Sequence, residues 1–135
     1  MSGAKSPDLK SLVAVLVVSS DEQDHHALRG ILSGRCQCHR AGTRGETSSF
    51  LKRDCPRLVI CDQVLPDGDW RDVLADLQKE EQAPLLIVVS RHPDERLWAE
   101  VLNLGGYDVL MKPFDHAEVS RVVNMATKKS NTATG

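Results

Sequence analysis

The sequence is poor in aromatic side chains and has no excess of positive charge. Only 4% of its 135 residues are aromatic, and the formal net charge is −2. A chain without a basic field lacks the electrostatic feature that nucleic-acid binders share, so we expect no nucleic-acid partner. Few rings are available to stack on a flavin, which makes a flavin-binding electron carrier the weakest of the functions considered.

The sequence also has no long hydrophobic run and no recognisable targeting segment. No apolar stretch approaches the ~20 residues that a membrane-spanning helix needs. Residues 1–10 lack the apolar core of a signal peptide. We therefore expect a cytoplasmic protein without a membrane partner. The length favours one domain at residues 11–128, between a flexible tail at 1–10 and a disordered polar tail at 129–135.

The four cysteines do not form a recognisable framework. Cys61 lies inside an apolar run, where a free cysteine behaves as a small core residue. Cys36, Cys38 and Cys55, taken together with His39, match no common spacing of zinc ligands. The cysteines therefore give little support for a metal centre.

Short apolar runs alternate with stretches of helical periodicity along the whole chain. The predicted strands are residues 12–18, 36–41, 57–62, 85–89 and 108–111, and a predicted helix follows each of them. Ser20 with Gln23 fits a capping box for the first helix. Parallel strands need a crossover helix each, and such crossovers are right-handed. The pattern predicts an α/β fold: one parallel sheet with two helices on one face and three on the other.

Three polar side chains fall where predicted strands end. Asp62 closes the third run, just before a turn at Pro66-Asp67-Gly68, while Ser90 and Lys112 close the fourth and fifth. Singly, each is explained as a turn residue or a solvated cation. In a parallel sheet these ends gather at one edge, which is where open α/β folds place their chemistry. A carboxylate there can accept a phosphoryl group, and a hydroxyl and an ammonium can bind its oxygens.

Three blocks of the sequence resemble the CheY-like receiver domain of two-component response regulators. They are Val-Ile-Cys-Asp-Gln-Val-Leu-Pro at 59–66, Ile-Val-Val-Ser at 87–90, and Gly-Gly-Tyr-Asp-Val-Leu-Met-Lys-Pro-Phe at 105–114. The resemblance extends over about 12–128. It implies a flavodoxin-like (βα)5 doubly wound sheet with strand order 2-1-3-4-5.

The same resemblance implies roles for individual residues. Asp62 would be the phosphoacceptor, Ser90 the switch hydroxyl and Lys112 the phosphate-binding lysine, with a cis peptide at Lys112-Pro113. Asp62 and the backbone carbonyl of Val64 would ligate Mg²⁺.

The sequence departs from the family where an acidic pair should follow the first strand. Ser19 and Ser20 occupy those positions, and Asp21 comes one residue late as a replacement ligand. Mg²⁺ prefers carboxylate oxygens to hydroxyls, so we expect it to bind weakly or not at all. Arg91 follows Ser90 where the family has a small residue, and a long cation there would cover Asp62 or pair with it.

Two functions follow from the resemblance. The first is a response regulator receiver domain in a two-component phosphorelay, which is not an enzyme but accepts a phosphoryl group from a histidine kinase or phosphotransfer protein. It would signal to a downstream protein through residues 94–128, where Trp98 is either an exposed anchor or a core residue. The alternative is a degenerate receiver that acts as an interaction module without phosphorylation.

Overall fold

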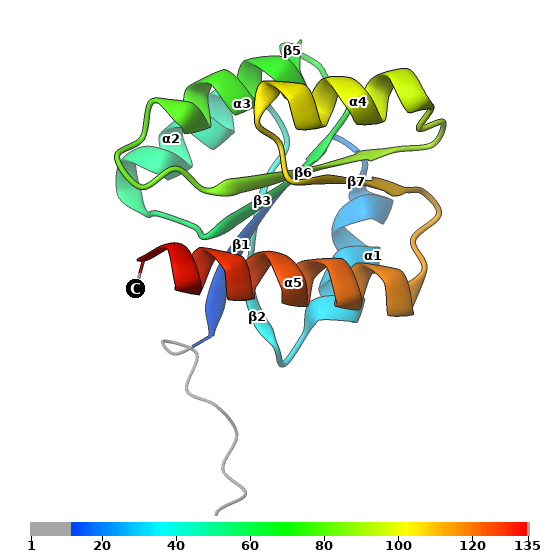
Figure 1. Ribbon diagram of the computed structural model, residues 1–135, viewed down its shortest axis with the longest axis horizontal. Helices are drawn as coiled ribbons and strands as arrows, with labels where there is room; N and C mark the ends of the chain where they lie inside the picture. Colours follow the sequence, from blue (N-terminus) through cyan, green and yellow to red (C-terminus); the bar gives the residue numbers. More distant parts are fainter. Residues whose placement is uncertain (1–11, 135) are drawn as a thin grey trace, which may run out of the picture.

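The computed structural model describes residues 12–134, with side chains to residue 129, and places five parallel strands in one central sheet (Figure 1). The strands are β1 (Val13–Val18), β2 (Cys36–Ala41), β3 (Leu58–Asp62), β6 (Leu85–Ser90) and β7 (Asp108–Met111). Their order is β2-β1-β3-β6-β7, and every neighbouring pair is parallel. This is the predicted order 2-1-3-4-5 when the five strands are counted along the chain. The predicted tail at 1–10 lies outside the described residues.

A short antiparallel hairpin, which the sequence did not predict as strands, follows β3. It pairs β4 (Val64–Leu65) with β5 (Gly68–Asp69), and the predicted turn forms its tip. A Cβ atom at Gly68 would lie 2.6 Å from a carboxylate oxygen of Asp72, so a larger residue would displace the side chain that accepts from the Asp69 backbone N–H. The hairpin leads the chain from the end of β3 into the next helix.

The helices form two layers, one on each face of the sheet (Figure 1). They are α1 (Glu22–Leu32), α2 (Arg44–Arg53), α3 (Trp70–Gln78), α4 (Glu95–Leu104) and α5 (His116–Thr134). Apolar residues of α2, α3 and α4 pack on one face, and those of α1 and α5 on the other. The predicted division into three helices and two is confirmed. Among the described residues, no helix is both long and apolar enough to cross a membrane.

Successive residues of each strand face opposite layers because side chains alternate along a strand. In β3, Val59 and Cys61 pack towards α2, α3 and α4. Leu58 and Ile60 pack towards α1 and α5. A strand that is buried on both faces must be apolar throughout, and this is why the runs were readable in the sequence.

Two helix ends differ from those predicted. The N-cap of α1 is Asp21, whose side chain accepts a hydrogen bond from the Gln23 backbone N–H at 2.9 Å, whereas Ser20 was predicted. Both residue types cap helices well, so these two neighbouring positions left the start of the helix open by one residue. At the other end of the chain, α5 continues to Thr134, so the prediction of disorder from 129 is wrong over 129–134. No proline or glycine interrupts the sequence between Pro113 and Gly135, so nothing there stops the helix.

Candidate functional site

The structure brings Asp62 and Lys112 together at the carboxyl edge of the sheet. Lys112 Nζ donates a hydrogen bond to Asp62 Oδ1 at 3.1 Å. The Lys112-Pro113 peptide is cis, as predicted, and the Lys112 backbone N–H donates to the Ser90 carbonyl at 2.9 Å. The end of β7 is therefore fixed against the end of β6, and this contact positions the lysine next to the acid.

Ser90 is at the same edge but does not contact Asp62. Its hydroxyl donates to Gln63 Oε1 at 2.8 Å and accepts from the His92 backbone N–H at 3.1 Å. Alternation explains the separation: Asp62 continues the row of Ile60 towards α1 and α5, while Ser90 continues the row of Val88 towards α3 and α4. Sequence reasoning missed Gln63, the residue after Asp62, whose side chain accepts the hydrogen bond from the Ser90 hydroxyl.

Lys112 is a buried cation with two carboxylate partners. Its side chain is 8% exposed, and Nζ donates to Asp24 Oδ2 at 2.8 Å as well as to Asp62. Burial alone would lower the pKa of Lys112, but the hydrogen bonds to Asp24 and Asp62 outweigh it and the pKa is raised. Lys112 is therefore an ammonium ion at neutral pH, with two of its three N–H donors on carboxylates.

Asp24 is the functional residue that sequence reasoning missed most clearly. It lies in the first turn of α1 and is only 4% exposed. Its Oδ2 accepts hydrogen bonds from Ser19 Oγ at 2.7 Å and from Lys112 Nζ at 2.8 Å. Helical spacing held a signal, because Asp24 precedes Leu28 and Leu32 by one and two helical repeats of four residues and so falls on the buried stripe of α1.

The segment after β1 is held by hydrogen bonds that engage the Asp21 side chain with α1 and Arg91. Ser19 Oγ accepts from the Asp21 backbone N–H at 3.0 Å, and the Ser19 carbonyl lies 2.7 Å from His25 Nε2. One Asp21 oxygen caps α1, and the other is 3.7 Å from Arg91 Nη2. The ion pair of Arg91 is therefore with Asp21, whereas Asp62 pairs with Lys112.

These donors do not make a magnesium site of the usual kind. Of the three predicted ligands, Asp21 caps a helix, and Asp62 Oδ1 already accepts from Lys112 Nζ and from the Gln63 backbone N–H at 2.8 Å. The third, Val64, offers a neutral carbonyl. Within residues 12–129, no group of three or more acidic, histidine or cysteine side chains is arranged to hold a metal ion. Mg²⁺ is commonly held by one or two carboxylates with waters completing an octahedron. Of the two predicted carboxylate ligands, Asp62 alone lies next to Lys112, and the lysine ammonium already occupies one of its oxygens.

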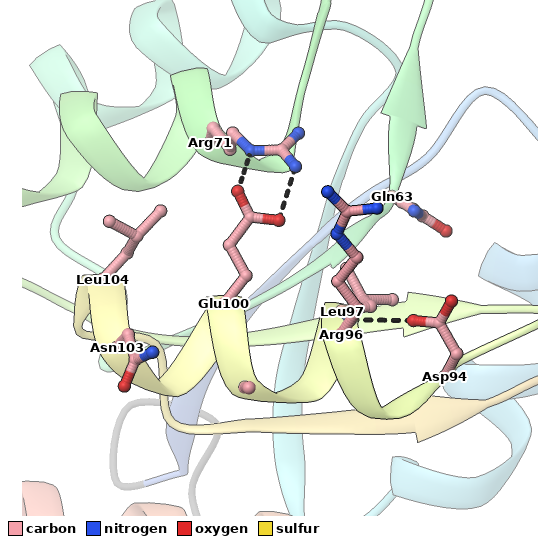
Figure 2. A pocket seen from close by; sticks show the side chains of 9 residues that line it. Gln63, Arg71, Asp94, Arg96, Leu97, Glu100, Asn103 and Leu104 are labelled. Carbon is pink, nitrogen blue, oxygen red and sulfur yellow. Dashed lines mark hydrogen bonds and ion pairs between the residues drawn. The ribbon is translucent and has the colours of Figure 1, made fainter.

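A cavity between α3 and α4 opens beside Gln63 (Figure 2). Its volume is about 580 Å³. A double hydrogen bond crosses it, from Arg71 Nε and Nη2 to the two oxygens of Glu100, each at 2.6 Å. The hydrogen bonds from Arg71 lower the pKa of Glu100, so this pair stays ionised at neutral pH. The ion pair connects α3 to α4 across the cavity.

The opposite side of α4 carries exposed apolar side chains next to β7 and α5. Trp98 is 50% exposed and Met111 is 57% exposed. Both line a groove of about 310 Å³, which Val109 and Glu118 also line. Trp98 Nε1 lies 3.4 Å from Asp108 Oδ1. The interpretation of Trp98 as a core residue is wrong.

Comparison with known proteins decides the family. The model of the family described as response regulator receiver domain matches residues 15–124. This chain belongs to the response regulator receiver domain family. Receiver domains are signalling modules that interact with histidine kinases or phosphotransfer proteins and with effector domains, and they generally bind Mg²⁺ for phosphorylation.

Individual relatives agree with this assignment. The receiver domain is 30% identical to the KDP operon transcriptional regulatory protein KdpE of Escherichia coli K12 over 89% of this chain and 53% of that protein. It is also 30% identical to the sensor histidine kinase TmoS of Ectopseudomonas mendocina over 95% of this chain and 14% of that protein. The signal receiver domain of an HD domain-containing protein from Pseudomonas fluorescens Pf-5 superposes with a TM-score of 0.83 at 24% identity, covering 99% of this chain and 96% of that one. This receiver domain therefore spans about half or less of the curated relatives named here.

Proposed function

We propose that this receiver domain accepts a phosphoryl group on Asp62 from the phosphohistidine of a histidine kinase or phosphotransfer protein. The observation that carries the proposal is the 3.1 Å contact between Asp62 Oδ1 and Lys112 Nζ. A carboxylate is a competent phosphoryl acceptor. Lys112 supplies a fixed positive charge where the phosphoryl oxygens would arrive.

The transfer is a displacement at phosphorus. A carboxylate oxygen of Asp62 forms the new O–P bond while the N–P bond to the donor histidine breaks. The electron pair of that bond stays on the imidazole nitrogen, and the acid becomes an acyl phosphate. Asp62 is 19% exposed, so it can be reached from solvent while Lys112 stays buried beneath it.

Ser90 carries the response to the sheet's other face in this proposal. Its hydroxyl donates to Gln63 in the structure and would have to leave that partner to reach a phosphoryl oxygen on Asp62. Gln63 lines the cavity beside α4 (Figure 2). A change in the hydrogen bond of Ser90 would therefore alter the contacts of Gln63 next to α4. We assign the exposed face that α4 forms with β7 and α5, within residues 94–128, to a downstream partner.

Incubation with a small phosphodonor such as acetyl phosphate tests the acceptor. Intact-mass spectrometry should show one added phosphoryl group that hydroxylamine removes, and Asp62→Asn should abolish it. Asp54→Asn, which changes an exposed acid after α2, is the matched control and should remain phosphorylated. The reaction is run with and without Mg²⁺, and beryllofluoride serves as a second probe of Asp62.

Absence of the acyl phosphate with every donor would overturn the proposal and favour the degenerate receiver. The hydroxyls at Ser19 and Ser20 are the observation behind that alternative. A degenerate receiver would bind its partner through residues 94–128 with the same affinity in the wild type and in Asp62→Asn.

A further inference from the structure

A buried carboxylate at Asp24 needs an explanation, because it interrupts an apolar helix face. The residue is 4% exposed and shares the buried side of α1 with Leu28 and Leu32. Placing an ionised carboxylate out of water is strongly unfavourable unless it is paired and hydrogen-bonded. A leucine at this position would continue the stripe. The hydrogen-bond partners of the carboxylate therefore decide whether its burial is favourable.

Both partners of Asp24 meet a single oxygen. Oδ2 accepts from Lys112 Nζ at 2.8 Å and from Ser19 Oγ at 2.7 Å. Lys112 comes from the opposite end of the chain and also donates to Asp62. Asp24 thus reaches the phosphoacceptor through the lysine and does not contact Asp62 itself.

The hydroxyl of Ser19 is compatible with this arrangement only because it is neutral. Ser19 is 2% exposed and donates its one O–H to Asp24, while its oxygen accepts from the Asp21 backbone N–H. A second carboxylate at position 19 would face the first at hydrogen-bond distance, with no proton between them. Like charges at that separation repel strongly in a buried site. We therefore expect the buried site to tolerate a carboxylate at position 19 or at position 24, but not at both.

We propose that Asp24 is a positioning residue that holds the Lys112 ammonium against Asp62, and that this role requires an uncharged residue at position 19. The proposal rests on the proposed function for its meaning in signalling, but the contacts it describes exist without phosphorylation. An aspartate at position 19 is one bond longer than serine, and its carboxylate would extend from the place of Ser19 Oγ towards Asp24 Oδ2, which lies 2.7 Å from that oxygen. A carboxylate there should take over the lysine when Asp24 is neutralised.

The test measures how readily Lys112 reacts with an acylating reagent in the absence of any phosphodonor. Trace labelling with acetic anhydride, read by peptide mass spectrometry, compares Lys112 with the exposed Lys79 in the same molecule. Asp24→Asn should raise the relative reactivity of Lys112 on the order of tenfold, because the ammonium loses one of its two hydrogen bonds to carboxylates. Ser19→Asp/Asp24→Asn should return it to near the wild-type value. Glu22→Gln removes the same charge from an exposed ion pair on the same helical turn and should change nothing.

Stability measurements on the same variants test separately whether positions 19 and 24 tolerate only one carboxylate. Ser19→Asp alone should lower the urea midpoint, and adding Asp24→Asn should raise it again, which is a coupling that independent sites would not show. The proposal is overturned if Lys112 reacts equally in Asp24→Asn and Glu22→Gln. It is also overturned if Ser19→Asp is tolerated equally well with either residue at position 24, or if the double variant fails to protect Lys112. Should Asp24→Asn not fold, the double variant carries the test.

Failure of this proposal is distinguishable from failure of the proposed function. A domain that never accepts phosphate on Asp62 would still show the predicted labelling pattern. If Asp62 is phosphorylated, Asp24→Asn should slow acyl-phosphate formation and the double variant should restore it. Simple loss of packing at Asp24 would not be rescued by a carboxylate on a different element.

Discussion

Replacing Lys112 with methionine should destabilise the domain more than any other single change at an ionisable residue of the site. Methionine keeps the length of the side chain and removes the charge. Asp24, whose side chain is 5% exposed, and Asp62 at 19% would then share the site without a cation. Removing one partner of a buried ion pair costs about 3–5 kcal/mol. Asp62 can recover some hydration, so we expect about 3 kcal/mol, or a fall in Tm of about 10 °C.

Urea unfolding at pH 7, followed by circular dichroism, measures this loss. Lys79→Met, at an exposed lysine after α3, is the control and should stay within ~0.5 kcal/mol of the wild type. Adding Asp24→Asn to Lys112→Met should recover more than half of the loss, because one of the two stranded charges is gone. A loss no larger than that of the control would show that water already solvates the acids and would refute the reasoning.

The pKa of Lys112 also predicts how this difference varies with pH. The folded pKa is raised above that of the unfolded chain, which lies at about 10.4. The stabilisation is therefore fully present below pH ~10.4 and is lost as pH rises through the folded value. The wild type and Lys112→Met should converge in stability only at strongly alkaline pH. Convergence near neutral pH would contradict the assigned charge state.

Three further outcomes are expected. Gln63→Leu removes the acceptor of the Ser90 hydroxyl and should increase the rate of beryllofluoride binding, which is measured from the NMR signal of the Ser90 backbone amide. An unchanged rate would show that Gln63 does not restrain Ser90. Trp98→Ala should cost less than ~1 kcal/mol in urea unfolding because the ring is half exposed, whereas a core aromatic would cost about 3–5 kcal/mol. Ser19→Asp/Asp24→Asn should bind Mg²⁺ more tightly than the wild type by calorimetric titration, since it returns a carboxylate to the strand end; equal affinities would argue against that account.

The fold could be predicted because local pattern and topology agree. A parallel strand buried on both faces must be apolar along its whole length, and β1 and β6 are recognisable on that ground alone. Once the strands were known to be parallel, the gathering of Asp62, Ser90 and Lys112 at one edge followed from direction. Direction alone did not give the contact of Lys112 with Asp62, because Ser90 lies at the same edge and pairs with Gln63 instead.

The parts of the site that were missed depend on tertiary partners. Asp24 looked like an ordinary polar residue early in a helix, because its partner Lys112 lies 88 residues further along the chain. Gln63 was noted only as a member of the block at 59–66, because the sequence does not show which hydroxyl an amide side chain will contact. Ser20 and Asp21 are neighbouring residues of similar capping ability, so the sequence could not decide which of them caps α1.

The division of the site between the two faces of the sheet gives β3 an unusual constraint. Asp62 and Gln63 are adjacent, yet one belongs with Lys112 on the α1 and α5 side and the other with Ser90 on the α3 and α4 side. If the proposed function holds, a single peptide unit joins the phosphorylated residue to the side chain that lines the cavity beside α4. Because side-chain direction has a period of two, inserting or deleting one residue in β3 would turn Asp62 and Gln63 to the opposite faces of the sheet. Asp62 would then be separated from Lys112, and Gln63 from Ser90. Substitutions in β3 that keep each residue on its face preserve both pairs, whereas a change of one residue in its length does not.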